Sequence, residues 1–474
     1  MSKPDHASAD PPARRPDTAP TRRGLVALSA AAAATLGLDR AAAQEAPAAP
    51  PPPGGGLALG GDAKPAGRCA AVSDTPTAER PPPQEDWRDF SASEVELAFR
   101  NHGMQAEFLR EPITPLGAHF LLVHFDVPRL DARDYSVAVG GHVRNPAQVP
   151  LRDLQKRHVV TQAVTMECAG TGRSTMRPRS IYVPWFREAV GTYRWTGTPL
   201  RPLLEQAGLL DGAREVLFTG WDTGVDLGVE HAFERSLPLD EALRDEVMLA
   251  WEANGQPLLP QHGFPLRLVV PSWYGMASVK WLRAITVLDK PFQGVEQARV
   301  YRYQQGADDP GEPVTRKRVN SAILPPGIPD LVTRRRFLAP GRHTIQGMAW
   351  SGSGRVTHVD FSADGGAHWR EARLATVAHG RFAWLRWQAE WDAGAPGDHV
   401  LACRARDEAG NVQPLDAQET WNRQGMGGNA VQRLAVTVQG GVGVAATRVP
   451  SPTREAVPGA KLPPSPNVAS LRAP

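Results

Sequence analysis

The sequence predicts an α+β domain followed by an all-β domain, an immunoglobulin-like sandwich. Between residues 87 and 325, short strand-like and helix-like patterns mix without the regular alternation of a doubly wound sheet. Between 326 and 440, short apolar runs recur at even spacing and are separated by turn residues, which is typical of a β-sandwich. A loop-like, proline-rich stretch, 299–332, lies where the two patterns meet.

Three segments of the first domain carry recognisable local patterns. Tyr135–Gly141 alternates in hydropathy like a strand that ends in a turn. Leu200–Gly208 has the pattern of a short helix closed by a glycine. Leu266–Pro271 is a continuous apolar run, which favours a buried strand. Strands and short helices in this mixture predict the α+β class.

The second domain is predicted from four strand-like runs and one turn. The turn, Ala363–Ala367, contains Asp-Gly-Gly, which is a hairpin signal. Cys403 alternates with Leu401 and Ala405 along one strand face, so we expect it to be a core residue, since a buried cysteine packs like a small apolar side chain. The strand-like runs are His343–Ala349, Thr357–Ser362, Ala383–Gln388 and Val400–Arg404.

Both ends of the chain are predicted to lie outside these domains. Residues 1–43 hold the pair Arg22–Arg23, an apolar stretch of about fifteen residues and a run of alanines, which is typical of a signal peptide. The paired arginines resemble the twin-arginine type, with an ordinary secretory signal as the alternative. Residues 44–86 and 441–474 are rich in proline, alanine and glycine and predict a disordered linker and tail. We therefore expect a periplasmic protein.

Composition excludes several classes of function. The 474 residues include 53 basic and 50 acidic ones, so no bulk field predicts a nucleic-acid or membrane partner. Three cysteines cannot form a disulfide framework. Cys69 lies in the linker and Cys403 in a predicted core, which leaves Cys168 for chemistry. The sequence has no Cys-x-x-Cys-His motif, so we expect no haem in this chain.

Cys168 lies in the glycine-rich run Val164–Ser174, which also contains Arg173. A thiolate binds soft metals, and small residues let a bulky cofactor approach the backbone. Together with further motifs in order along residues 95–440, this run resembles the sulfite oxidase family. The further motifs are Arg100–His102, Pro184–Trp185, Arg194–Gly197, Thr219–Asp222, Asn254–Pro257, His262–Pro271, Ser278–Trp281, Gln297–Tyr301, Gly347–Gly352, Asp364–Gly366 and Asn411–Arg423.

The resemblance implies a molybdenum–molybdopterin cofactor with Cys168 as the metal ligand. It implies that three arginines converge on a small oxyanion, for which planar guanidinium groups are well suited. One of them, Arg423, directly follows Asn422, whereas many relatives have one residue between the two. The implied catalytic residues are Arg100, Arg173, Trp185, Tyr301 and Arg423. The implied cofactor contacts are Arg100, Asn101, His102, Asp222, His262, Arg267, Ser278, Val279 and Lys280.

The resemblance also implies an activity and partners. The activity is molybdenum-dependent oxidation of sulfite to sulfate, with electrons passed to a separate c-type cytochrome, by a homodimer that associates through the β domain. Three alternatives stay open. They are the sulfane dehydrogenase component of a thiosulfate-oxidising system, a periplasmic sulfoxide reductase, whose relatives lack the C-terminal sandwich, and a metal-free exported binding module.

Overall fold

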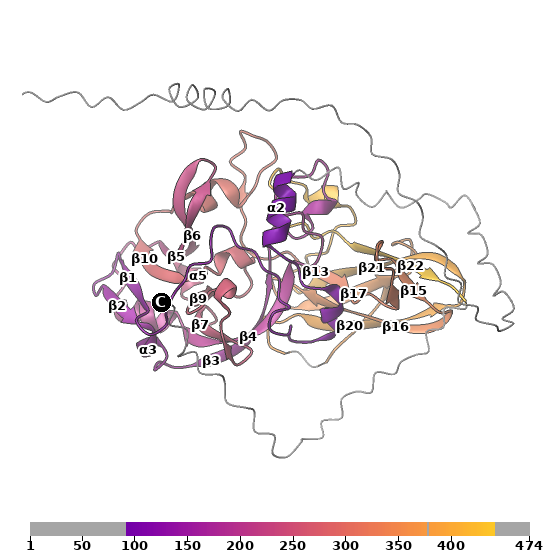
Figure 1. Cartoon of the computed structure of the whole chain (residues 1–474), viewed down its shortest axis with the longest axis horizontal. Helices are drawn as coiled ribbons and strands as arrows, with labels where there is room; N and C mark the ends of the chain where they lie inside the picture. Colours follow the sequence, from indigo (N-terminus) through magenta and orange to yellow (C-terminus); the bar gives the residue numbers. More distant parts are fainter. Residues whose placement is uncertain (1–91, 377–378, 441–474) are drawn as a thin grey trace, which may run out of the picture. The chain divides into compact units, whose positions relative to one another are not determined.

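The computed structural model describes residues 92–376 and 379–440 (Figure 1), and these belong to one compact unit. The predicted signal peptide (1–43), linker (44–86) and tail (441–474) lie outside the described residues. Within the described part, no helix is long and apolar enough to cross a membrane.

The first domain contains two five-stranded sheets. The strands of one are, in spatial order, β2 (Ala147–Pro150), β1 (Ser136–Gly141), β10 (Leu282–Leu288), β5 (Glu215–Asp226) and β6 (Val229–Pro238). In this sheet β1 is parallel to β10, and the other neighbours are antiparallel. The other sheet contains β3 (Val160–Glu167), β4 (Val190–Pro199), β7 (Met248–Ala253) and β8 (Gln256–Pro257), with β9 (Arg267–Val269) also paired to β7.

The helices of the first domain are short. The α-helices are α2 (Ala92–Arg100), α3 (Leu151–Leu154), α4 (Arg201–Ala207) and α5 (Leu239–Ala242). Four further turns that carry site residues are η3 (Arg173–Thr175), η4 (Pro260–His262), η5 (Gly275–Ala277) and the π-helical η6 (Glu296–Val300). The helix α4 ends at Gly208, whose φ of 72° is left-handed, as the sequence predicts. The α2 helix was not predicted.

Two sheets form the second domain. One has the order β13 (Asn320–Ile323), β16 (Gly341–Trp350), β20 (Leu385–Ala393) and β19 (Arg373–Leu374). The other has the order β14 (Ile328–Pro329), β15 (Arg336–Leu338), β22 (Gln432–Val438), β21 (Gly397–Asp407), β17 (Val356–Ser362) and β18 (Arg370–Glu371). The four predicted strands are present as β16, β17, β20 and β21, and the predicted turn joins β17 to β18.

The boundary between the domains lies earlier than the predicted 325/326. Asn320 of β13 pairs with Trp350 of β16, so β13 belongs to the second domain. Between the two domains, β11 (Arg302–Tyr303) and β12 (Glu312–Pro313) form a two-stranded ladder. The sequence prediction missed β13 because it is only four residues long and lies in a proline-rich stretch.

One apolar cluster is shared by both sheets of the second domain. Ile345 and Trp387 come from the four-stranded sheet, whereas Phe361, Cys403 and Val436 come from the six-stranded sheet. Side chains of two sheets that share one core must face each other, so the sheets pack as two layers. Cys403 is fully buried, which confirms the prediction that it is a core residue. The immunoglobulin-like type stays a prediction.

Trp387 provides a test of this core. Its side chain is fully buried, and its ring lies 6.4 Å from that of Phe361. We expect Trp387→Ala to lower the free energy of unfolding by about 3–5 kcal/mol, because it removes a large buried side chain. Denaturant unfolding measures this. The control, Val332→Ala, changes an 85% exposed side chain of the same domain and should alter stability by less than about 0.5 kcal/mol. Equal effects would contradict the two-layer core.

Candidate active site

Cys168 directly follows β3 and is buried. Its Sγ accepts a hydrogen bond from the backbone N–H of Gly170 at 3.4 Å. Burial raises the pKa of the thiol, and the positive charge of Arg173 opposes that rise. The turn that follows needs a glycine, because Gly172 has a φ of 79° and a Cβ there would lie 2.3 Å from the carbonyl oxygen of Gly428. The chain therefore folds back tightly at this thiol, against a segment of the second domain.

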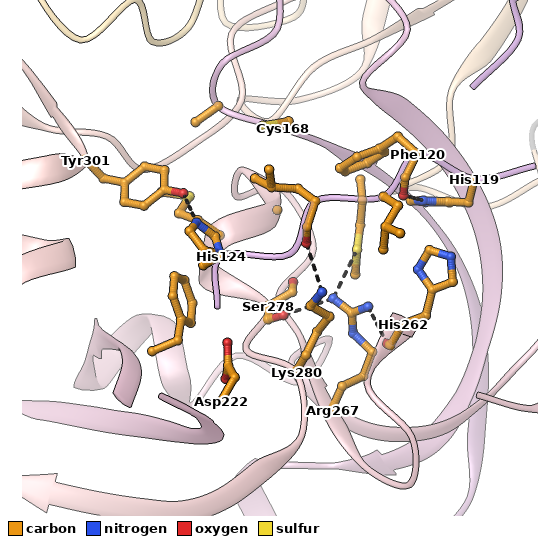
Figure 2. A pocket seen from close by; sticks show the side chains of 17 residues that line it. His119, Phe120, His124, Cys168, Asp222, His262, Arg267, Ser278, Lys280 and Tyr301 are labelled. Atoms are coloured by element: carbon orange, nitrogen blue, oxygen red, sulfur yellow. Dashed lines mark hydrogen bonds between the residues drawn. The ribbon is translucent and has the colours of Figure 1, made fainter. Parts of the chain in front are cut away.

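Two cavities meet at Cys168. The first cavity is lined by groups from the loop 119–124, from β5 and from the segment 262–280, and Figure 2 shows its labelled side chains. The second cavity is lined by groups from α2, from the loop around Arg173 and from the end of η6. Four residues line both cavities, namely Leu122, His124, Cys168 and Tyr301. Cys168 therefore lies where the two cavities adjoin.

Two cationic side chains line the first cavity (Figure 2). Arg267 donates to the carbonyl oxygens of His262 at 2.8 Å and Ser278 at 2.9 Å. Lys280 Nζ donates to the carbonyl oxygen of Leu122 at 2.9 Å. Burial, reinforced by the nearby Arg267 guanidinium, lowers the pKa of Lys280 to about 7. Both groups have lost most of their hydration and have only neutral partners here, the carbonyl oxygens and, for Arg267, the Met166 sulfur at 3.7 Å, so this cavity favours an anionic ligand group.

An unsatisfied acceptor lies in the same cavity. Asp222 Oδ1 is buried and has no hydrogen-bond partner among the residues that the structure describes. Burial raises the pKa of this carboxyl to about 6, although Lys280 opposes the rise. Burial also lowers the pKa of His262 to about 2, so this imidazole is neutral. A carboxylate oxygen buried without a donor is costly, so Asp222 fits a ligand that brings an N–H or O–H group.

Arg173 occupies the second cavity. Its side chain is buried, Nη1 donates to the carbonyl oxygen of Val183 at 2.9 Å, and the guanidinium lies 5.1 Å from the ring centre of Tyr182. Trp185 is buried in the same wall. Tyr301 Oη shares a 2.6 Å hydrogen bond with Nε2 of His124. A guanidinium, an indole and a phenol therefore surround the space next to Cys168.

The structure brings most, but not all, of the predicted site residues to these cavities. Asp222, His262, Arg267, Ser278 and Lys280 line the first cavity, Asn101, Arg173 and Trp185 line the second, and Cys168 and Tyr301 line both. Arg100, His102, Val279 and Arg423 line neither. The predicted roles of these four residues in binding or catalysis stay predictions.

Arg100 and His102 contact residues of the cavity walls, because Phe125 lines the second cavity and Leu121, which pairs with His102, lines the first. Arg100 and His102 are exposed, and the Arg100 guanidinium donates to the carbonyl oxygen of Phe125. The buried Val279 uses its carbonyl oxygen to accept from Leu268 N at 2.8 Å. Arg423 is exposed, and its backbone N–H donates to the carbonyl oxygen of Gln304 at 2.7 Å.

His119 and His124 were not predicted from the sequence. Both line the first cavity, and the loop 119–124 pairs with the segment Arg100–His102 through a bridge between Leu121 and His102. Burial lowers the pKa of His119 to about 4 and that of His124 to about 3. The signal that could have found them is two imidazoles five residues apart around an otherwise apolar run.

A buried carboxylate ties the second domain to the Cys168 loop. Glu167 immediately precedes Cys168, and its Oε1 accepts from Asn320 Nδ2 at 2.8 Å, while Oε2 accepts from Trp350 Nε1 at 2.9 Å. Both donors lie on strands of the second domain. In addition, the backbone N–H of Gly427 donates to the carbonyl oxygen of Ala169 at 2.6 Å. The second domain therefore helps to fix the backbone on both sides of the thiol.

Comparisons with known proteins agree with this architecture. Residues 124–296 match the family model of the oxidoreductase molybdopterin binding domain, and residues 313–439 match that of the Mo-co oxidoreductase dimerisation domain. The sulfite oxidase of Gallus gallus is 35% identical over 342 residues, which cover 68% of this chain and 72% of that protein. The chain belongs to the sulfite oxidase family. This sulfite oxidase family member therefore has a molybdopterin-binding domain followed by a β-rich domain of the dimerisation type.

Two further relatives define how far the similarity extends. The mitochondrial sulfite oxidase of Mus musculus is 36% identical over 352 residues, and the match covers 69% of this chain but only 62% of that protein. The crystal structure of the sulfane dehydrogenase SoxCD from Paracoccus pantotrophus matches with a TM-score of 0.61 and 29% identity, over 70% of this chain and 85% of that chain. The first family model begins at His124, so the segment Arg100–His102 lies outside it.

The residues of the first cavity fit a molybdenum–molybdopterin cofactor. Asp222 offers an acceptor without a donor, and Arg267 and Lys280 offer donors for anionic groups. Cys168 offers a sulfur ligand at the edge of the same cavity, and thiolates suit soft metals. In the described part of the chain, no group of three or more His, Cys, Asp or Glu side chains could hold a metal ion.

Replacing Glu167 tests the link between the domains. We expect Glu167→Ala to lower the free energy of unfolding by about 1–3 kcal/mol for each of the two buried donors that it leaves unpaired. Denaturant unfolding of the metal-free protein isolates this effect from cofactor binding. The matched control is Glu371→Ala, which changes an exposed carboxylate of the second domain. If the two variants were equally stable, Glu167 would not join the domains.

Proposed function

We propose that this chain oxidises a sulfur centre at a molybdenum–molybdopterin cofactor held by Cys168, with oxidation of sulfite to sulfate as the reaction. The observation that carries the proposal is the position of Cys168 between two unlike cavities. One holds dehydrated cations and an unsatisfied carboxylate, and the other holds Arg173 beside Trp185 and Tyr301. A cofactor in the first cavity and a substrate in the second would meet at the thiol.

The cofactor would be held by residues of the first cavity. Cys168 would ligate the metal as a thiolate, Asp222 would accept a hydrogen bond from the pterin, and Arg267 and Lys280 would bind its anionic end. Their side chains already line one cavity. When bound, the cofactor supplies an oxygen atom and accepts two electrons; the protein positions it and excludes water.

Residues of the second cavity would orient the substrate. Arg173 would bind an oxygen of the substrate, because a buried guanidinium retains its charge and donates in fixed directions. Because His124 has a pKa of about 3, its imidazole is neutral, and its hydrogen bond holds the Tyr301 hydroxyl beside Cys168. Trp185 would close the wall and keep bulk water away.

Partners and location complete the proposal. The match of residues 313–439 to a dimerisation domain supports a homodimer. The paired arginines Arg22–Arg23 support export to the periplasm through the twin-arginine route. With no haem-attachment motif in the sequence, electrons would pass to a separate c-type cytochrome. The β-rich second domain counts against the sulfoxide reductase alternative.

A second candidate is oxidation of a sulfane sulfur. It is supported by the similarity to the sulfane dehydrogenase SoxCD. It is also supported by the second cavity, where Arg173 is the one arginine contributed by the described residues. A sulfane sulfur carries less negative charge than sulfite and requires fewer cations.

Cys168→Ser tests the proposed function. Protein made in a host that synthesises the cofactor is assayed for molybdenum, and for sulfite oxidation coupled to reduction of cytochrome c or ferricyanide. We expect metal near one per chain and sulfite turnover in the wild type. The variant should lose turnover by at least about 10³-fold, because a hydroxyl is a poor ligand for a soft metal.

Cys403→Ser is the matched control, since this thiol lies in the core of the second domain. It should keep both the metal and turnover per folded molecule. Metal without any sulfite turnover would favour the sulfane candidate. Exported wild-type protein that remains metal-free would contradict the proposed function.

A further inference from the structure

A buried carboxyl group lines the second cavity without a role in the proposed binding of cofactor or substrate. Glu296 is the first residue of η6, and only 1% of its surface is exposed. One of its oxygens, Oε2, has no hydrogen-bond partner among the residues that the structure describes. A buried acceptor without a donor is costly, so this oxygen fits an O–H group that enters the cavity. A carboxylate repels an anionic substrate, so substrate binding does not explain Glu296.

The other oxygen of Glu296 contacts a histidine. Oε1 lies 3.4 Å from Nε2 of His231 on β6, and the two share a hydrogen bond. The second ring nitrogen, Nδ1, lies 2.9 Å from the carbonyl oxygen of Val229, which can only accept, so Nδ1 carries a proton. A neutral His231 then has its lone pair on Nε2, facing an oxygen of Glu296. These two atoms form a hydrogen bond only when one proton lies between them.

His231 connects this pair to solvent. Its side chain is 14% exposed, whereas that of Glu296 is 2% exposed. The ring of Phe125, which lines the second cavity, lies edge to face against the His231 ring at a centroid distance of 5.3 Å. One member of the pair thus lines the cavity and the other reaches the surface. The hydrogen bond between them gives a proton a path from the cavity to solvent.

Charged groups of both signs surround the pair. The buried Arg235 on β6 donates through Nη1 to the carbonyl oxygen of Glu296 at 2.8 Å, and its guanidinium lies 5.3 Å from the ring centre of Tyr301. Asp226, at the end of β5, lines the same cavity. Burial, reinforced by Asp226, raises the pKa of Glu296 to about 7, while His231 and Arg235 oppose the rise. Glu296 therefore gains and loses a proton near neutral pH.

Three arginines supply positive charge to the cavity or to its wall. Arg173 lines the cavity, and Arg100 donates to the carbonyl oxygen of Phe125 in the wall. Burial raises the pKa of Tyr182, another wall residue, and the charge of Arg423 is among those that oppose the rise. An oxyanion therefore fits beside Glu296, as the proposed function requires.

We infer that Glu296 and His231 form the proton exit of the active site, with Glu296 as the group that takes protons from water in the second cavity. The inference rests on the proposed function. Sulfite and water give sulfate, two protons and two electrons. The electrons pass one at a time to a c-type cytochrome, or to ferricyanide in the assay. The two protons must leave a buried site, and the pair supplies their route.

Each proton follows the same steps. An O–H bond of the water breaks, and its proton binds to Oε2 of Glu296 while the pair still holds its shared proton. The His231 imidazolium then releases one proton to solvent. The carboxyl group turns, and the proton taken from water becomes the shared one between Oε1 and Nε2. The pair ends as it began, so it can carry the second proton in the same way.

Glu296→Gln tests this role in the metal-loaded enzyme with saturating sulfite and ferricyanide. We expect kcat to fall by about 10²-fold, which is the lower end of the contribution of a positioned proton acceptor. In the wild type, kcat should decline as the pH falls below about 7, because Glu296 must be ionised to accept a proton. The variant should lose this dependence on pH. A small basic buffer such as imidazole should restore part of its turnover, in proportion to the buffer concentration.

Two further variants separate proton transfer from a structural role. Glu296→Asp keeps a carboxyl group, so it should keep the decline of kcat at low pH and turn over faster than Glu296→Gln. Glu230→Gln changes an exposed carboxylate next to His231 and should match the wild type in kcat and in pH profile. If Glu296→Gln kept the wild-type kcat and pH profile, or if no buffer restored its lost turnover, the inference would be overturned.

Infrared difference spectroscopy of the full metal-free chain tests the pair without turnover. In the difference between wild type and Glu296→Gln, the C=O band of a protonated carboxyl group should disappear with a midpoint at about pH 7. In a His231→Gln background the midpoint should move to higher pH, because His231 lowers the pKa of Glu296. A band that did not respond to His231→Gln would overturn the inference. Metal-loaded wild type that oxidised no sulfite would instead contradict the proposed function, and the infrared titration would still decide whether Glu296 and His231 act as a pair.

Discussion

The buried carboxylate of Glu167 fixes the start of the Cys168 loop, and the loop geometry depends on it. Glu167 ends β3, and its two oxygens accept from Asn320 and Trp350 of the second domain. Burying a carboxyl group is costly unless hydrogen bonds compensate, and burial raises the pKa of this one to about 7. Contacts of the second domain therefore help to position the thiol. A β domain remote in sequence thus becomes part of the catalytic unit.

The sequence predicted those elements that are determined by a few neighbouring residues, such as turns and helix ends. The glycine that ends α4 and the Asp-Gly-Gly turn after β17 are fixed by backbone conformations that few residues adopt, so their residue types identify them. The loop 119–124 has no such signal. Part of its contribution is a backbone group, since the carbonyl oxygen of Leu122 accepts from Lys280. Any residue at position 122 could supply that oxygen, so residue type does not mark the position. The polar residues of Arg100–His102 gave the stronger sequence pattern.

Of the three arginines predicted to converge, Arg173 lines the second cavity, and Arg423 lies in a turn that contacts Arg173. Asn422 holds this turn closed, because its Nδ2 donates to the carbonyl oxygen of Met426 at 2.7 Å and its Oδ1 accepts from Met426 N at 2.9 Å. Closure directs Gln424 and Met426 toward Arg173 and leaves Arg423 exposed. The same closure decides which residues of the turn contact Arg173. Residue type alone cannot show this, because which position faces inward depends on how the turn closes.

The two cavities differ in their charged lining residues. The first cavity has Arg267 and Lys280 against Asp222, whereas the second has Arg173 against Asp226 and Glu296. Charges buried in a medium of low polarity attract over several ångströms, so a cofactor with an anionic end would be held at the first cavity by Arg267 and Lys280. Arg173, in the second cavity, would then remain available beside Cys168 to bind a substrate.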